Sequence, residues 1–135
     1  MKKQPKFSFR SARLYLFLLT ASTLLILFGT LFPVDRHMPR SFLGYDKVIH
    51  FLMFGAWSFL YGIVRFFRGH LKLYPVLIWG TIFGLSVEIL QHFLPTNRSF
   101  ELMDLAADLA GTFVAIGILY LLERQFPWFR NNQKK

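Results

Sequence analysis

Charged and polar side chains interrupt three long apolar stretches of the sequence. They carry carboxylate, ammonium, imidazole or amide groups: Asp46, Lys47, His50, Glu88, Gln91, Asp104 and Asp108. A charge at the centre of a bilayer costs about 2.5 kcal/mol or more on insertion scales, so such groups usually face a partner or a cavity. Carboxylates and imidazoles can also exchange protons or hold a ligand. These residues are therefore the candidates for the chemistry of this protein.

The sequence has four long apolar runs. They cover about residues 14–32, 48–66, 73–94 and 102–122. Each is about as long as the ~20 residues that a helix needs to cross a bilayer. The chain is 54% hydrophobic and only 17% charged, which is too little charge to cover the surface of a soluble domain. The sequence therefore predicts an all-α fold, an integral membrane four-helix bundle that forms a single domain over residues 1–135.

Basic residues are distributed unevenly between the two sides that these runs define. Twelve belong to one side: Lys2, Lys3, Lys6, Arg10, Arg13, Arg65, Arg68, Lys72, Arg124, Arg130, Lys134 and Lys135. The other side has only Arg36, Arg40, Lys47 and Arg98. Because basic residues favour the cytoplasmic side, we expect both termini in the cytoplasm and the 33–47 and 95–101 loops outside. This pattern accounts for the net charge of +9, and no nucleic-acid partner is expected.

The polar residues inside the runs gather toward the external side. His50 follows Asp46 by four positions, so both lie on one face of a helix. Asp104 and Asp108 have the same spacing, and Glu88 precedes the end of its own run by a few residues. At 1.5 Å per residue these groups lie within roughly 13 Å of the external interface. We therefore expect one polar site in the outer half of the last three helices, with the 14–32 helix contributing only apolar surface.

Several of these residues also have ordinary structural explanations. Asp46 and Ser99 have the side chains of helix N-caps. Glu101, near a helix start, is expected to be solvated and to complement the helix dipole. His92 reads as an interfacial side chain, and Gly111 as a position where two helices pack closely.

Three motifs occur in order on the last three runs. They read Asp46-Lys47-x-x-His50-Phe51, then Glu88-x-x-Gln91, then Arg98-Ser99 followed by Asp104, Asp108 and Gly111. In these motifs, over about residues 43–120, the sequence resembles the VanZ-like family. The matching polar positions are Asp46, Lys47, His50, Glu88, Gln91, Arg98 and Asp104. At Asp108 the family more often has asparagine, so this chain has an additional acidic side chain.

The resemblance implies a location and a phenotype rather than a reaction. The family is widespread in bacteria and is named for a membrane protein linked to low-level resistance to the glycopeptide teicoplanin. We therefore expect a multi-pass protein of the bacterial cytoplasmic (inner) membrane that acts in the cell envelope.

A binding function suits these residues best. Apolar walls with a few convergent polar groups are typical of ligand sites. Arg98, Lys47 and His50 are predicted to contact a phosphate or carboxylate, while the acids orient them or meet an amine. The expected partner is a membrane lipid or a lipid-linked envelope precursor. Homo-oligomer formation stays open.

Two alternatives remain. His50, Glu88, His92 and Asp108 have the groups for acid–base catalysis by a membrane enzyme on a lipid-linked or cell-wall substrate. Glu88 and His92 share a helical face and can hold a divalent metal. The sequence contains no HExxH motif, nucleophile elbow or cysteine, so no cofactor or metal site is predicted, and whether the protein is an enzyme stays open. The second alternative is a purely structural polar network between helices.

Overall fold

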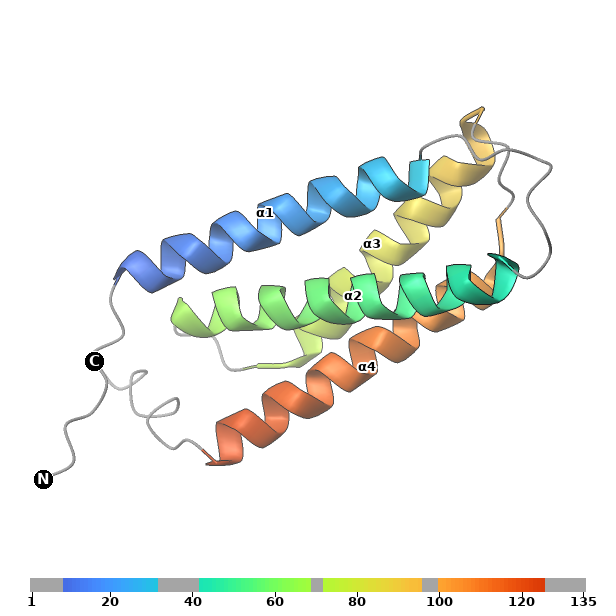
Figure 1. Cartoon of the computed structure of the whole chain (residues 1–135). Coiled ribbons are helices and arrows are strands. Elements are labelled where there is room, and N and C mark those ends of the chain that lie inside the picture. The colour runs from blue at the N-terminus through green and yellow to red at the C-terminus, as the bar shows by residue number, and fades with distance from the viewer. Residues whose placement is uncertain (1–8, 32–41, 69–71, 96–99, 126–135) are drawn as a thin grey trace, which may run out of the picture.

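The computed structural model describes residues 9–31, 42–68, 72–95 and 100–125, which form four α-helices (Figure 1). These are α1 (Phe9–Leu31), α2 (Phe42–Phe67), α3 (Tyr74–Phe93) and α4 (Leu102–Gln125). All four are long and apolar enough to cross a membrane. The prediction of an all-α fold with four membrane-spanning helices is confirmed.

The helices extend beyond the apolar runs that predicted them. α2 begins at Phe42, six residues before the predicted start, and α4 continues to Gln125. An apolar run marks only the part of a helix that lies in hydrocarbon, whereas the hydrogen-bonded helix continues into the interface. Asp46 consequently lies inside α2, so the interpretation of Asp46 as an N-cap is wrong.

Prolines set both ends of α3. Pro75 occupies the first turn, where its missing N–H removes no helical hydrogen bond. At the other end, Leu94 adopts an extended conformation with ψ of 152°, and its N–H donates to the carbonyl oxygen of Leu90. The residue before a proline disfavours the helical region, so Pro95 explains why α3 ends there.

The helices bring their polar ends together. The end of α1, the start of α2, the end of α3 and the start of α4 lie at the same end of the molecule (Figure 1). We call this the polar end, because Asp46, His50, Glu88 and Asp104 lie there. α2 is in contact with all three other helices, and its interface with α4 is the most extensive.

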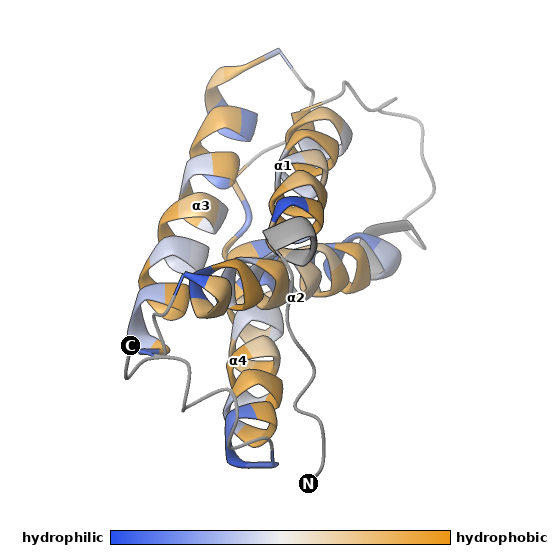
Figure 2. Cartoon of the chain, turned by 90° about the vertical axis from the view of Figure 1, so that its left-hand side faces the viewer, coloured by the Kyte–Doolittle hydropathy of each residue, from blue (hydrophilic) through white to orange (hydrophobic). Residues whose placement is uncertain are grey.

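The outward faces of the helices are apolar. Figure 2 shows apolar residues along most of each helix. On α1 the side chains of Phe17, Leu25 and Phe28 are 68%, 66% and 71% exposed. Side chains of this kind are stable on an outward face when lipid tails surround it.

A close approach of two backbones fixes the interface of α2 and α4. A Cβ atom added to Gly111 on α4 would overlap the carbonyl oxygen of Phe51 and lie 2.9 Å from the backbone nitrogen of Gly55. Only glycine fits this crossing, which confirms the prediction that Gly111 is a packing position. The approach also brings the polar faces of the two helices within hydrogen-bonding distance of each other.

Candidate functional site

A histidine and two carboxyl groups meet at the centre of the bundle near its polar end. His50 comes from α2, Glu88 from α3 and Asp108 from α4, and each residue is at most 1% exposed. His50 Nδ1 lies 2.9 Å from Asp108 Oδ1, within hydrogen-bonding distance. The same nitrogen lies 3.9 Å from Glu88 Oε1. The three helices therefore place their most polar side chains on one shared point, as the sequence predicts.

This centre keeps hydrogen-bonding atoms without partners. Three buried atoms there, His50 Nε2, Glu88 Oε1 and Asp108 Oδ2, have no hydrogen-bond partner. More than nine in ten buried polar groups in proteins do have one, and a buried group left without one costs about 1–3 kcal/mol. A network that served only to hold the helices together would be expected to use these atoms.

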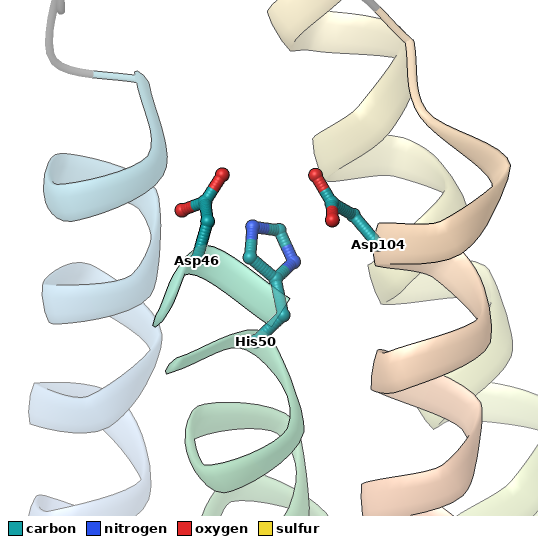
Figure 3. A group of neighbouring side chains, drawn as sticks. All are labelled: Asp46, His50 and Asp104. Atoms are coloured by element: carbon teal, nitrogen blue, oxygen red, sulfur yellow. The ribbon is translucent and has the colours of Figure 1, made fainter. Parts of the chain in front are cut away.

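Two further carboxyl groups, those of Asp46 and Asp104, lie beside the histidine ring. Figure 3 shows the side chains of Asp46, His50 and Asp104 pointing toward one another from α2 and α4. One ligating atom from each of the three residues lies within 4.8 Å of the other two. Asp104 is buried and Asp46 is partly exposed, so this group reaches from the interior to the rim of the polar end.

Lys47 links the starts of α2 and α4 at this rim. Its Nζ lies 3.0 Å from Glu101 Oε2 and 3.1 Å from Asp104 Oδ1. The Lys47 and Glu101 side chains are 36% and 40% exposed, so solvent screens that pair, whereas Asp104 is nearly buried. Lys47 therefore positions the carboxylate of Asp104.

Glu101 has a larger part in the site than the sequence indicates. Besides its ion pair with Lys47, its backbone N–H donates to Glu88 Oε2 at 3.1 Å. The prediction that Glu101 is merely solvated therefore misses both contacts. Its spacing of three residues from Asp104 was the available signal, because that spacing places two carboxylates near one face.

Helix α1 contributes a polar contact as well as apolar surface. The buried side chain of Gln91 donates from Nε2 to the backbone carbonyl oxygen of Thr30 at 2.9 Å. Farther from the polar end on α1, Thr23 Oγ1 accepts a hydrogen bond of 2.8 Å from the indole N–H of Trp57. The expectation that this helix supplies only apolar surface is wrong, because hydrogen bonds that use backbone carbonyls and threonine leave no mark in a hydropathy pattern.

The polar faces of α2 and α4 continue deeper into the bundle. Ser58 and Thr112 are buried, and their hydroxyl oxygens lie 2.9 Å apart. Glycine on α3 leaves room for this face, since a Cβ at Gly84 would lie 3.0 Å from Asp108 Oδ2. Thr112 follows Asp108 by four residues, which is the signal that could have identified this pair.

Other predicted residues stand apart from the centre or are not described. His92 is exposed, whereas Glu88 is buried, so the two side chains have different surroundings. His92 instead packs edge-on against Phe93. Arg98 and Ser99 lie outside the described residues.

The described part of the polar end is acidic and rich in metal-ligand atoms. Five carboxyl groups lie there with one ammonium group: Asp46, Glu88, Glu101, Asp104 and Asp108 against Lys47. Two groups of three residues have the spacing to hold a metal ion. They are Asp46, His50 and Asp104, and His50, Glu88 and Asp108. His50 belongs to both groups.

The comparisons agree with the motifs. A family model described as VanZ/LLP1 matches residues 3–123, a range that contains every predicted site residue. No curated protein and no solved structure was found to match the chain. The match covers nearly all of the four helices, and the resemblance that the motifs indicate is thereby confirmed. The chain belongs to the VanZ/LLP1 family and is a VanZ-like membrane protein.

Proposed function

We propose that this protein binds the headgroup of a membrane lipid or of a lipid-linked envelope precursor at its polar end. Both sources share one chemistry, a phosphate group attached to an apolar tail. The exposed apolar faces of the helices suit the tail, and the polar end suits the headgroup. In the orientation that the basic residues favour, this end faces the outside of the bacterial inner membrane.

The observation that carries the proposal is the set of buried atoms without partners around His50. A ligand that supplies hydrogen bonds or charge to these atoms recovers free energy that the protein alone does not. A structural network offers no such gain. Active and binding sites commonly hold polar groups in arrangements that only a ligand completes.

Lys47 is the described cation best placed for a phosphate. Its side chain is partly exposed at the rim, directly beside the buried acids. Arg98, which the family motif includes, is the second cation that we assign to this role. The acids beneath Lys47 repel a phosphate, so the phosphate is expected at the rim against Lys47, and an amine on the headgroup would suit the acids.

A membrane enzyme that acts on a lipid-linked substrate is the second candidate. Asp108 holds one ring nitrogen of His50 and leaves the other without a partner. A carboxylate that orients a histidine in this way is one of the arrangements that serves general base catalysis. Release of phosphate from a polyprenyl diphosphate, lost in His50→Gln, would favour the enzyme over the binding protein.

Lipid retention tests the binding proposal. Purified protein is offered phosphatidylethanolamine, phosphatidylglycerol or a polyprenyl diphosphate, and the bound lipid is counted by native mass spectrometry. We expect Lys47→Gln to reduce retention of the preferred lipid at least tenfold. Thr112→Val is the matched control, because it removes a buried hydrogen bond on the same interface outside the site.

The three lipids distinguish the sources of the phosphate. Preference for the diphosphate indicates an envelope precursor, and preference for either phospholipid indicates a membrane lipid. Equal retention by wild type, Lys47→Gln and Thr112→Val would contradict the proposal. Since the family resemblance implies a link to teicoplanin, we further propose that headgroup binding underlies lowered susceptibility to that glycopeptide.

A further inference from the structure

The two nitrogens of the His50 ring have different surroundings. Nδ1 lies within hydrogen-bonding distance of Asp108 Oδ1, so a neutral ring donates its proton there and keeps a lone pair on Nε2. Nε2 is buried and has no hydrogen-bond partner. Figure 3 shows the ring between the carboxyl groups of Asp46 and Asp104. The histidine ring and the two carboxyl groups thus lie close together.

We propose that His50 Nε2, Asp46 and Asp104 bind one divalent metal ion of the zinc type. One ring nitrogen of His50 and one carboxyl oxygen from each of the two acids lie within 4.8 Å of one another. Ligand atoms in a tetrahedral zinc site lie about 3.4 Å from one another, since each bond is about 2.1 Å long. Small side-chain rotations therefore bring these atoms onto one ion.

The donor set favours a transition metal over magnesium or calcium. Imidazole nitrogen suits zinc, iron, copper and nickel, whereas magnesium and calcium prefer ligands that are all oxygen. One imidazole with two carboxylates gives three protein ligands and leaves a coordination position open. Three protein ligands with an open position are typical of zinc sites that bind a further molecule.

Asp108 is the positioning residue of this site. A metal-bound histidine commonly donates its other ring N–H to a carboxylate, which fixes the orientation of the ring. The 2.9 Å contact between His50 Nδ1 and Asp108 Oδ1 is a contact of this kind. The buried Nε2 without a partner is the independent sign that the ring is oriented for something other than the protein itself.

The surroundings of the site give the ion a way in and a reason to bind. Asp46 is partly exposed at the polar end, so an ion can reach its carboxylate. Asp104 binds Lys47 through Oδ1, which leaves its other oxygen for the ion. A divalent charge would offset the excess of buried carboxylates. The next step rests on the proposed function. The open coordination position of the metal would accept a phosphate oxygen of the headgroup. The acids alone would repel that oxygen.

Zinc binding to the full chain tests the inference without any added lipid. Purified protein is stripped with EDTA, dialysed against Zn²⁺, and analysed for bound metal. We expect one zinc ion per chain, and a loss of affinity of at least tenfold in His50→Gln and in Asp104→Asn. His92→Gln is the matched control, because His92 is an exposed histidine near the same end of the bundle.

Substitutions of Asp108 distinguish positioning from direct ligation. Asp108→Asn keeps an oxygen that accepts the Nδ1 proton, so zinc affinity should fall by about tenfold or less. Asp108→Leu removes that oxygen, and zinc affinity should fall to the level of His50→Gln. Melting temperatures of all variants show whether the bundle is intact. If Asp108→Asn lost zinc as completely as His50→Gln, Asp108 would be a ligand and the assignment would be wrong.

The outcomes for metal and lipid are separate. Lack of stoichiometric zinc in folded wild type, or an equal loss in His92→Gln, would overturn the metal site. Lipid retention that persists in EDTA would then leave the proposed function standing. Zinc bound without any retained lipid would support the metal site and contradict the proposed function.

Discussion

Single side chains at the polar end leave some of their hydrogen-bonding atoms unused. His50 uses one ring nitrogen on Asp108, and Glu88 uses one oxygen on the backbone N–H of Glu101. Each has a second, buried atom with no partner. Buried charged groups contribute little to stability unless their hydrogen bonds are complete, so selection for stability alone would favour apolar residues here. The incomplete bonding supports the proposal that the polar end binds a ligand.

The spacing of these residues predicts which of them share a helix face. Asp46 with His50, and Asp104 with Asp108, stand four residues apart on apolar runs, and this spacing alone indicates a shared face. The partners of Lys47 could not be predicted, because an ion pair between two helices depends on their relative rotation and depth. The same limit applies to Glu88, whose depth was predicted but whose contact with Glu101 was not.

At the scale of elements, the α2–α4 interface positions the site. Gly111→Ala adds a Cβ against the Phe51 carbonyl oxygen and the Gly55 nitrogen, so the two helices must separate. We expect the free energy of unfolding to fall by about 1–3 kcal/mol, the usual cost of overpacking. Thermal or denaturant unfolding in detergent micelles measures this change.

Gly117→Ala on the same helix is the control for that substitution. A Cβ at Gly117 would meet no atom within 4 Å, so unfolding should be unchanged or slightly harder. Equal destabilisation by the two substitutions would show that helix flexibility, and not the close approach of α2 and α4, explains the glycine at position 111.

The sequence predicted the number and type of the helices, but it did not predict which contacts each helix face makes. Apolar length predicted four helices, and Pro75 and Pro95 marked the ends of α3. Helix starts were placed too late in α1 and α2, because hydropathy does not detect helical turns at the interface. The bond from Gln91 to the Thr30 carbonyl oxygen was missed because every helix has such carbonyls, and only the fold decides which one is used.

At the scale of the whole molecule, the orientation decides which compartment the site faces. The basic residues predict that the polar end is outside. The chain has no cysteine, so single cysteine variants report one position each. We expect a membrane-impermeant maleimide to label Phe100→Cys in intact spheroplasts, and to label Arg68→Cys and Gln125→Cys only after lysis.

These three positions are exposed and lie near opposite ends of the bundle. Labelling of Arg68→Cys and Gln125→Cys in intact spheroplasts, with Phe100→Cys protected, would reverse the orientation. The site would then face the cytoplasm, and a ligand from the outer leaflet would be excluded.

Glu88→Gln distinguishes a binding site at the polar end from a structural network. The amide keeps an oxygen for the Glu101 N–H but removes the buried charge. Melting temperature and retained lipid are measured on the same preparation, by thermal unfolding and native mass spectrometry. If the polar end is a binding site, we expect a melting temperature close to that of wild type and lipid retention reduced at least tenfold. A melting temperature lowered by several degrees with lipid retention unchanged would contradict it.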